Sequence, residues 1–600
     1  METKRLATDF CVIGGGMAGV CAAIAAARHG ARVVLVQNRS VLGGNASSEI
    51  KMHICGANFC RQGARESGLI EELRLEDAAR NPQRAYPLWD LLLYEKVKAA
   101  GVTLLLDTEF TSAKVEAGRI VSVRALRNST EDEFEIAATY FADCSGDGRL
   151  GAEAGAEFRV GREARAEYGE SIAPEQADTM TLGNSILFTA KKHDRPMPFV
   201  APDWVRRFQK HEFKHRSLAG QESFEYGYWF AEWGGHLDTI KDGETIRHEL
   251  LRIALGIWDY VKNSGETPNS ANWALEWVGA VPGKRENRRL LGAHVLAQDD
   301  LMSGRLFPDQ VAFGGWPIDL HPPRGMDAID EPPCVHHKLP HLYSIPLRSL
   351  FSRNIRNLFF AGRNISATHV AFGSTRIMAT CALVGQGIGT AAASGIRHKL
   401  TTAAPLVEAP LIGEIQQTLL RDDATLLGVP NTDAGDLARI ARVSASSAQP
   451  GHEPASVLDG VTRSLKPEWG SWSDGASHQW RATGVEEWLE LSWNKPVSLA
   501  EIHLTFDTGF ERVLMLTPSD SLTRDWMIRG PQPETIKVYR LLADGKEVWR
   551  EDNNHLRKRV HHFTQPIPVK TLRLEVLATH GAAEARLFEI RCYGHASSEQ

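Results

Sequence analysis

The glycine-rich segment at residues 14–19 restricts the fold of this chain more than any other feature. It reads Gly-Gly-Gly-Met-Ala-Gly and lies between a short apolar run, residues 10–13, and an alanine-rich run, residues 20–29. Residues 32–36 form a second apolar run, so the order is strand, glycine turn, helix, strand. The N-terminus of a helix after such a turn binds a pyrophosphate through its backbone N–H groups. The sequence therefore predicts an α/β dinucleotide-binding domain at the N-terminus.

Each residue of this turn has an expected role. Gly14 allows the tight turn, Gly16 lets a pyrophosphate approach the backbone, and Gly19 lets the helix pack closely on the strand. Met17 and Ala18, at the start of the helix, are expected to face the same nucleotide.

The end of the second strand departs from the usual dinucleotide pattern. An Asp or Glu there commonly hydrogen-bonds the adenosine ribose, but this chain has Gln37, Asn38 and Arg39. Gln37 can still bind a ribose through its amide. A missing acid beside an arginine also fits the 2′-phosphate of NADP, so this segment alone leaves NADP open as an alternative.

The composition is that of an ordinary globular protein. The 600 residues are 43% hydrophobic and 24% charged, which excludes a disordered chain. The formal net charge is −6 and no basic stripe stands out, so no nucleic-acid partner is expected. The eight cysteines form no regular framework and are expected to be reduced thiols.

No targeting or membrane segment is predicted. No apolar leader precedes the first strand, and the lipophilic stretch at residues 371–396 contains Arg376 and Gln386, which favours a buried helix over a membrane span. We therefore expect a cytoplasmic protein without a membrane span. The sequence leaves a homo-oligomer open.

The pattern of strands, helices and turns divides the chain into five segments. Residues 1–160 alternate strand and helix, residues 161–345 are irregular and rich in Trp, Pro and His, and residues 346–400 return to a strand and a long helix. Residues 401–440 are expected to be a helical connector. Residues 441–600 alternate with period two between turn residues, which is typical of a β-sandwich. The first and third segments are expected to form one domain, with the second inserted as a substrate or cap domain.

Three later motifs accompany the glycine turn. They are Gly-Gly-Asn-Ala-Ser-Ser-Glu at residues 43–49, Gly-Lys-Arg-Glu-Asn-Arg-Arg at residues 283–289, and Ala-Gly-Arg-Asn at residues 361–364 followed by Ala-Thr-His-Val-Ala-Phe-Gly-Ser at residues 367–374. With these motifs the chain resembles the FAD-dependent oxidoreductases of the glutathione-reductase and succinate-dehydrogenase superfamily. The resemblance implies an α/β fold with a Rossmann-like FAD-binding domain, an inserted α+β substrate domain and a C-terminal all-β jelly-roll sandwich.

The resemblance also implies which residues contact FAD. The glycine turn would meet the pyrophosphate, Gln37 the adenosine ribose, and the double-glycine segment the middle of the dinucleotide. A helix expected to begin near Ser374 would direct its N-terminus at the pyrimidine ring. The residues expected to bind FAD are Gly14, Gly16, Met17, Ala18, Gly19, Gln37, Asn38, Arg39, Gly43, Gly44, Asn45, Ala46, Ser47, Gly146, Asp147, Gly362, Arg363, Gly373, Ser374 and Thr375.

For the chemistry, the resemblance implies hydride transfer to the flavin while a side chain takes the proton. His369 is the first candidate for that base, because its segment is expected to pass the isoalloxazine ring, and His53 is the second. Arg376 is expected to stabilise negative charge on the pyrimidine ring. Aromatic side chains between residues 204 and 341 offer flat faces that suit sugar rings. We expect an FAD-dependent enzyme that oxidises a small carbohydrate-like alcohol to a ketone.

No metal site is predicted. His211 and His215 have the spacing of zinc ligands on a helix, but the basic residues around them favour a solvated face. The cluster of ligand-type residues from Cys334 to His341 is interpreted as a loop that lines the substrate site. In the motif at residues 283–289, the charged side chains are expected to form a structural ion-pair network, and a role in anchoring the substrate stays open as the alternative.

The C-terminal segment resembles discoidin-like, galactose-binding sandwiches. The resemblance rests on Ser-Val-Leu-Asp-Gly-Val-Thr-Arg at residues 456–463 and Phe-Glu-Ile-Arg-Cys-Tyr-Gly at residues 588–594, and leaves open whether this part binds glycan or calcium. Three alternative functions also stay open: flavin-assisted glycoside cleavage without net redox change, an NADP-dependent oxidoreductase, and a non-catalytic glycan-binding protein. The sequence does not define the substrate, the electron acceptor or whether the flavin is covalently attached.

Overall fold

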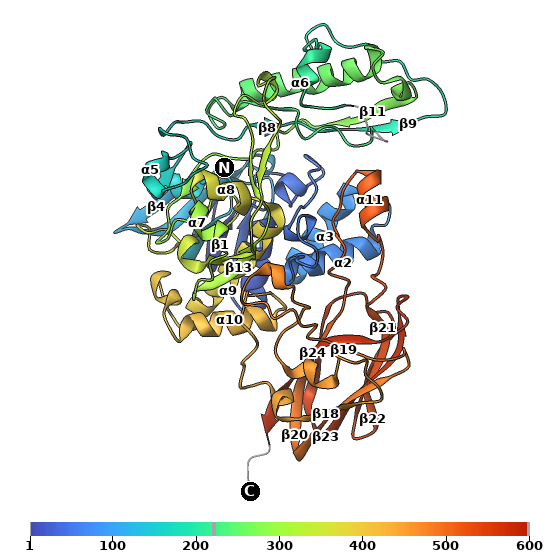
Figure 1. Ribbon diagram of the computed structural model, residues 1–600. Coiled ribbons are helices and arrows are strands. Elements are labelled where there is room, and N and C mark those ends of the chain that lie inside the picture. Colours follow the sequence, from blue (N-terminus) through green and yellow to red (C-terminus); the bar gives the residue numbers. More distant parts are fainter. Residues whose placement is uncertain (1, 219–223, 597–600) are drawn as a thin grey trace. The chain divides into compact units, whose positions relative to one another are not determined.

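The computed structural model describes residues 2–218 and 224–596. The chain forms two compact units, each assembled from segments that are far apart in the sequence (Figure 1). The first unit comprises Met1–Cys60, Arg84–Ile412 and Met515–Trp526. The second comprises Arg61–Gln83, Gly413–Leu514 and Met527–Gln600.

A mixed sheet with a parallel centre forms the base of the first unit. β1 pairs in parallel with β2 and β6, β2 pairs with β3, and β17 pairs with β6. The apolar run predicted at residues 10–13 is almost completely buried, as expected for a parallel strand that is covered on both faces. The strand order is β3-β2-β1-β6-β5-β4. The strands are β1 (Glu2–Ile13), β2 (Val33–Val36), β3 (Thr103–Leu105), β4 (Glu109–Glu116), β5 (Arg119–Arg127), β6 (Asp132–Asp143) and β17 (Leu358–Phe360).

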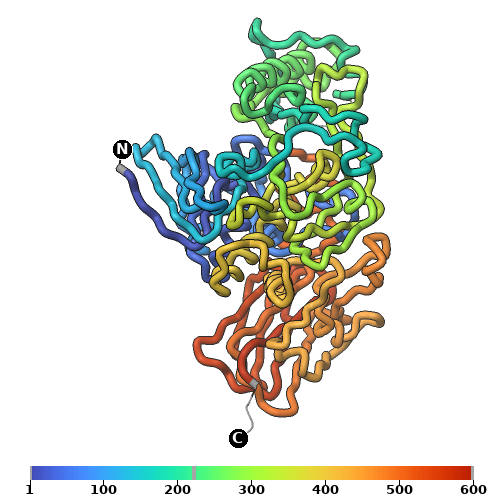
Figure 2. The backbone as a smooth tube through the Cα atoms, turned by 90° about the vertical axis from the view of Figure 1, so that its left-hand side faces the viewer, coloured from blue at the N-terminus to red at the C-terminus, as the bar shows by residue number. Residues whose placement is uncertain are grey.

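The sheet is larger than the sequence analysis predicted. β4, β5 and β6 form an antiparallel meander whose last strand continues into the parallel centre. β1 begins at Glu2 rather than at residue 10, because its first residues pair with the start of β6. Figure 2 traces these N-terminal strands in dark to light blue. In β4 and β5, polar and partly exposed residues are interspersed with apolar ones, so a search for continuous apolar runs did not indicate these strands.

Two helices of small residues pack against each other in the first unit. They are α1 (Met17–Arg28) and α9 (Met378–Arg397). A Cβ added to Gly385 would lie 2.1 Å from the carbonyl oxygen of Ala18, and one added to Gly389 would lie 2.3 Å from that of Ala22. Glycine at both positions therefore allows the backbones to approach this closely. In the described part of the chain, no single helix is both long and apolar enough to cross a membrane; α8 (His369–Thr375) and α9 reach that limit only together, and they meet at 91°.

The region predicted as a substrate domain contains an apolar core of its own. The amphipathic helix α6 (Gly243–Asn263) packs buried residues such as Ile253 and Trp258 against Phe188 and Tyr228. Short strand pairs complete this part of the first unit (Figure 1). They are β7 (Phe158–Arg159) with β12 (Arg289–Leu290), β8 (Asn184–Ser185) with β10 (Glu232–Trp233), β9 (Phe188–Lys192) with β11 (Trp273–Val278), β13 (Gln310–Gly314) with β16 (Tyr343–Pro346), and β14 (Ile318–Leu320) with β15 (Val335–His337). The other helices of this unit are α3 (Tyr86–Ala99), α4 (Arg149–Glu153), α5 (Arg165–Tyr168), α7 (Gln298–Met302) and α11 (Asp520–Trp526).

The second unit is built on antiparallel strand pairs. The strand order is β19-β24-β20-β23-β21-β22, with β18 also paired to β20. β20 is a single long strand whose register with β23 shifts along its length, between Ser492 and Val497 and again between Leu499 and Glu501. Alternate residues of these strands, including Leu489, Leu491 and Trp480, form the buried core. The elements are α2 (Leu69–Arg80), β18 (Arg442–Ala445), β19 (Trp480–Arg481), β20 (Trp488–Phe506), β21 (Ile536–Ala543), β22 (Lys546–Glu551), β23 (Lys558–Thr579) and β24 (Arg586–Ala596), and α10 (Leu411–Arg421) begins at the boundary between the units.

Two segments lie in a different unit from the one that the sequence suggested. Residues 61–83, including α2, belong to the second unit, and residues 515–526, including α11, belong to the first. On α2, Leu75 and Ala78 are buried against Leu514 of the second unit. From the sequence, each segment was expected in the same domain as its neighbours in the chain. Their apolar and charged contacts, however, are with residues far away in the sequence.

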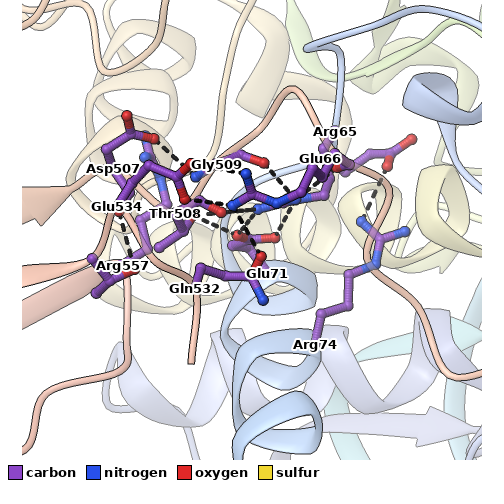
Figure 3. Close-up of polar contacts among 12 residues, drawn as sticks. Arg65, Glu66, Glu71, Arg74, Asp507, Thr508, Gly509, Gln532, Glu534 and Arg557 are labelled. Atoms are coloured by element: carbon purple, nitrogen blue, oxygen red, sulfur yellow. Dashed lines mark hydrogen bonds and ion pairs between the residues drawn. The ribbon is translucent and has the colours of Figure 1, made fainter. Parts of the chain in front are cut away.

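A buried arginine connects residues 61–83 to the strands of the second unit (Figure 3). Arg65 is fully buried and donates hydrogen bonds to both carboxylate oxygens of Glu71 on α2, at 3.0 and 2.7 Å. It also donates to the backbone oxygens of Thr508 at 2.8 Å and of Gly509 at 3.1 Å. Burial lowers the pKa of Arg65, although Glu71 opposes that effect. The arginine therefore combines charge compensation with several backbone contacts.

Candidate active site

A large cavity of about 1040 Å³ lies in the first unit. Its lining includes the glycine turn after β1, the ends of β2 and β6, the segment after β17 and the start of α9. In α/β sheets, ligands bind at the carboxyl ends of parallel strands, and these segments meet there. The volume is at the upper end of the roughly 300–1,000 Å³ that small-molecule sites occupy, so the cavity is large enough for a long ligand.

The glycine turn contains two kinds of glycine. Gly14 has a φ of +106°, and a Cβ there would lie 2.3 Å from the carbonyl oxygen of Cys144. Gly16 is the N-cap of α1 with a φ of −68°, and a Cβ there would meet no atom within 4 Å. Gly14, Gly16, Met17 and Ala18 line the cavity, whereas Gly19 packs against the carbonyl oxygen of Gly14. The turn therefore leaves open space beside the first turn of the helix.

Gln37, Asn38 and Arg39 also line the cavity, but two of these side chains are already bonded. The amide oxygen of Gln37 accepts a hydrogen bond of 2.8 Å from the backbone N–H of Gly15. Its amide nitrogen donates one of 3.0 Å to the carbonyl oxygen of Val41. Arg39 forms an ion pair of 3.3 Å with Glu49. Gln37 therefore holds the glycine turn in place, and a carboxylate already compensates the arginine that suggested a 2′-phosphate.

The double-glycine segment supplies three lining residues. Gly43 and Gly44 have φ values of +104° and +59°, and Asn45 donates a hydrogen bond of 3.0 Å to the carbonyl oxygen of Lys284. Ala46 and Ser47 are not among the lining residues that the structure describes. The hydroxyl of Ser47 instead closes the turn with a hydrogen bond of 2.7 Å to the carbonyl oxygen of Gly44.

An ion-pair cluster lies where β6 and β17 end. Gly146, Asp147, Gly362 and Arg363, which the resemblance implies as cofactor-binding residues, all line the cavity. Asp147 lies 2.7 Å from a guanidinium nitrogen of Arg363 and 2.6 Å from the ammonium nitrogen of Lys284. Burial alone would raise the pKa of Asp147, but the two cations lower it, so the carboxylate stays ionised.

The helix predicted to begin near Ser374 begins later. The short helix α8 ends with Gly373, Ser374 and Thr375, and none of the three is in the described cavity lining. The hydroxyl of Ser374 instead donates a hydrogen bond of 2.6 Å to the carbonyl oxygen of Trp316. After the bend of 91°, α9 begins at Met378, and its first residues line the cavity. The positive end of a helix dipole is thus directed at the cavity, but it belongs to α9.

The three candidate catalytic residues occupy different places. His53 and Arg376 line the cavity, but His369 is outside the lining that the structure describes. His369 is buried, and its Nδ1 lies 3.0 Å from Glu286. Glu286 also lies 3.3 Å from Arg289, so the structural ion-pair network expected in this motif includes His369. Burial would raise the pKa of Glu286, but His369 and Arg289 lower it.

His53 is a neutral histidine at the cavity. Burial lowers its pKa to about 4, so the imidazole is uncharged at pH 7. Its Nδ1 is buried and has no hydrogen-bond partner in the described part of the chain. Its ring lies 5.4 Å from that of Tyr226, which also lines the cavity.

A polar wall that sequence reasoning did not identify surrounds His321. Its Nδ1 lies 2.7 Å from Glu232, and its Nε2 lies 3.2 Å from Asp319. Asp319 is also 2.9 Å from Arg376, and Glu232 is 3.4 Å from Arg285. Burial would raise the pKa of Asp319, but His321 and the other cations lower it well below the usual range. Arg285 and Arg376 belong to segments noted in the sequence, whereas Glu232 and Asp319 lie in no such motif and are brought to the histidine by the fold.

Aromatic residues and a distant segment complete the cavity. Tyr226, Trp229 and Trp316 are among the lining residues. α11, which lies in the segment predicted as sandwich, also contributes, and Trp526 at its end stacks on Phe59 with ring centroids 5.3 Å apart. Its lining residues are Ser519, Ser521, Leu522 and Asp525.

The chain belongs to the family described as FAD dependent oxidoreductase, whose model matches residues 9–419. A solved family 32 carbohydrate-binding module from C. perfringens NanJ, in complex with galactose, is 16% identical and covers 26% of this chain and 96% of its own, with a TM-score of 0.18. The family 32 module from Streptococcus pneumoniae EndoD is 15% identical and covers 26% of this chain and 98% of its own, with a TM-score of 0.20. No curated protein matches the chain.

Proposed function

Because the chain belongs to the FAD dependent oxidoreductase family, we propose that its cavity binds FAD along the glycine loops and oxidises a carbohydrate-like alcohol to a ketone. One observation carries the proposal. The same cavity is lined by the glycine turns and by a polar and aromatic wall with a neutral histidine. The two parts of an oxidoreductase site, a dinucleotide cradle and a substrate end, therefore meet in one space.

The residues of the cradle fit FAD. The open side of Gly16 and the first turn of α1 can accept a pyrophosphate, because helix N-terminal N–H groups have no partners within the helix. Arg363 lines the same cavity, and its Nε is buried without a hydrogen bond in the described residues. A polar ligand beside this arginine would satisfy that nitrogen.

We also propose the finer fold assignments that the resemblance implied. The parallel centre and its glycine turn support a Rossmann-like FAD-binding domain of the glutathione-reductase and succinate-dehydrogenase type. The separate apolar core around α6 supports an inserted substrate domain. The antiparallel pairing of the second unit supports a jelly-roll sandwich.

When bound, FAD supplies the group that accepts two electrons as a hydride. The chain has to hold the alcohol and take its hydroxyl proton. We assign the role of proton acceptor to His53. Burial keeps its imidazole neutral, and no carboxylate pairs with it in the described structure. His321 is less suited, since both of its ring nitrogens face carboxylates.

Arg376 and the start of α9 supply positive charge beside the cavity. Arg376 is held by Asp319 at 2.9 Å, which fixes the guanidinium in place. A fixed cation and a helix N-terminus stabilise negative charge that develops during the reaction without having to reorganise. This is the role that the sequence suggested for Arg376.

The aromatic residues support a carbohydrate-like substrate. Trp229 and Trp316 can pack on the apolar C–H face of a sugar ring. Arg285 and His321 line the same cavity and can bind the hydroxyl groups of that sugar. Such a site needs both flat apolar faces and fixed polar groups.

The test is anaerobic reduction of the purified full-length protein by a panel of monosaccharides and disaccharides. We expect flavin absorbance in the purified protein and its bleaching by at least one sugar. His53→Phe should lower the rate of bleaching by about 10²- to 10⁴-fold, while His53→Gln, which keeps a polar group, should lose less. Both variants should retain wild-type flavin content.

Three results would change the proposal. Wild-type bleaching by His53→Phe would remove the histidine from the role of base. Flavin that no sugar reduces would contradict the substrate class and favour a glycan-binding protein. Cleavage of a glycosidic bond without an external electron acceptor would favour flavin-assisted glycoside cleavage without net redox change.

A further inference from the structure

Three side chains of ligand type converge on one wall of the cavity. Asp319 lies on β14, His336 lies on the antiparallel partner β15, and Cys334 is the residue immediately before β15. His336 is directly opposite Asp319 in the strand register, and Cys334 is two residues before His336. Residues two apart on a strand, and residues opposite each other on paired strands, face the same side. The pairing therefore brings the three side chains together.

Two of the three separations match the edges of a tetrahedral zinc site, and the third, between the Cys334 sulfur and a carboxylate oxygen of Asp319, is at most 4.8 Å. One donor atom from each of the three residues lies within 4.8 Å of the others. The Cys334 sulfur is 3.6 Å from Nε2 of His336, and Oδ1 of Asp319 is 3.1 Å from the same nitrogen. Zinc bonds of about 2.3 Å to sulfur and about 2.0 Å to nitrogen and oxygen give tetrahedral edges of about 3.5 Å and about 3.3 Å. These two observed separations agree with the edges within a few tenths of an ångström.

The buried donor atom of the three is Oδ1 of Asp319, which forms an ion pair with Nε2 of His336 at 3.1 Å. A metal ion bound to both atoms would take the place of the proton between them, because metal ligands have to be deprotonated. The other oxygen, Oδ2, is held by Arg376 at 2.9 Å and by His321 at 3.2 Å. Such outer contacts orient a carboxylate ligand.

We propose that Asp319, Cys334 and His336 bind a divalent transition metal, and that the ion is Zn²⁺. A thiolate, an imidazole and a carboxylate are the ligand types that zinc takes, and the two negative ligands balance its charge. All three residues line the cavity, so the fourth position is open to water or to an oxygen of the substrate. The geometry thus points to a metal site where the sequence suggested only a loop.

The metal adds a function to the polar wall. A bound Zn²⁺ polarises an oxygen that coordinates it, and a substrate hydroxyl in the fourth position would become more acidic. This role in the reaction rests on the proposed function, whereas binding of the metal does not.

The experiment measures metal binding by the full-length protein directly. Protein stripped with a chelator is titrated with Zn²⁺ for elemental analysis and with Co²⁺ for visible d–d absorption at wavelengths longer than those of oxidised flavin. We expect about one ion per chain and a tetrahedral cobalt spectrum. Cys334→Ser and His336→Ala should each weaken binding by at least about 10-fold. The matched controls, Cys60→Ser and His248→Ala, remove an exposed cysteine and an exposed histidine and should bind as the wild type does.

Two results would overturn the site: a wild-type protein that takes up no stoichiometric metal, or binding that is unchanged in both ligand variants. Flavin content is recorded for every sample. A wild-type protein that takes up no metal but has its full flavin content contradicts the metal site and leaves the proposed oxidoreductase function intact. Protein that binds metal but no flavin contradicts the proposed function and leaves the metal site intact.

Discussion

Nδ1 of His369 lies 3.0 Å from both carboxylate oxygens of Glu286, and the side chains are only 5% and 0% exposed. The backbone N–H of His369 also donates a hydrogen bond of 2.8 Å to Glu163. The start of α8 is therefore fixed by two buried acids. The pair explains why a histidine in a conspicuous motif does not line the cavity that the structure describes: its imidazole holds together two segments that are distant in sequence.

Replacing the acid of this pair should destabilise the first unit. Glu286→Gln removes the charge that compensates Arg289 and His369, and breaking a buried pair costs about 3–5 kcal/mol. We expect a fall of at least about 6 °C in the temperature of flavin release, followed by fluorescence during heating. Glu244→Gln, at an exposed position on α6, serves as the control and should not change that temperature.

The pH dependence of this effect has a definite sign. Because the pKa of Glu286 is lowered in the folded protein, its contribution is present above the unfolded value and is lost as pH falls through the lowered one. Glu286→Gln should therefore destabilise the protein at pH 8, where the carboxylate is ionised in both states, and the effect should shrink as the pH falls below the ordinary pKa of glutamate. A destabilisation that vanished at pH 8 would contradict the ionised pair.

The two kinds of glycine in the turn predict different failures. Gly16→Ala has an ordinary φ and open space for its Cβ, so we expect a folded protein that has lost most of its FAD. Gly14→Ala has a φ of +106° and a clash at 2.3 Å, so we expect a protein that folds poorly. Circular dichroism and flavin content measure the two effects. Gly243→Ala is the control, because its Cβ also has no atom within 4 Å. A Gly16→Ala protein with wild-type FAD content would show that the open side of Gly16 does not face the cofactor.

Asp90 should make the first unit less stable at high pH. It accepts hydrogen bonds from the backbone of Ser48, yet burial raises its pKa to about 6. A carboxyl with a raised pKa in the folded state loses stability as pH rises from about 4 to about 6. Asp90→Asn should therefore stabilise the protein by about 1–2 kcal/mol at pH 8 and have little effect near pH 4. Urea unfolding at both pH values tests this, with the exposed Asp203→Asn as control; an equal effect at both would be inconsistent with the raised pKa.

Arg65 should support the second unit alone. Arg65→Ala leaves Glu71 buried without its cation and removes the bonds to the Thr508 and Gly509 carbonyls (Figure 3). We expect the second unit to lose about 3–5 kcal/mol of stability while FAD stays bound to the first. Limited proteolysis combined with flavin absorbance separates the two effects. Arg550→Ala, at an exposed ion pair, is the control and should leave the proteolysis pattern unchanged. An unchanged pattern in Arg65→Ala as well would contradict the assignment of residues 61–83 to the second unit.

The sequence alone determined the features that depend on neighbouring residues. The apolar runs predicted the central parallel strands, and the glycine segment at residues 14–19 predicted the turn between β1 and α1. Period-two alternation predicted the strands of the second unit. These features repeat within a few residues, because strands and tight turns are set by local backbone geometry.

The tertiary structure decided what long-range contacts control. It placed His53 on the cavity lining and fixed His369 beside Glu286, and it assigned residues 61–83 and 515–526 to their units. It also brought the ligand-type residues of β14 and β15 together through strand pairing. No local pattern predicts such contacts. Their stability comes from burying charges and apolar surface between segments that are far apart in the sequence, or between strands that meet only when the sheet forms.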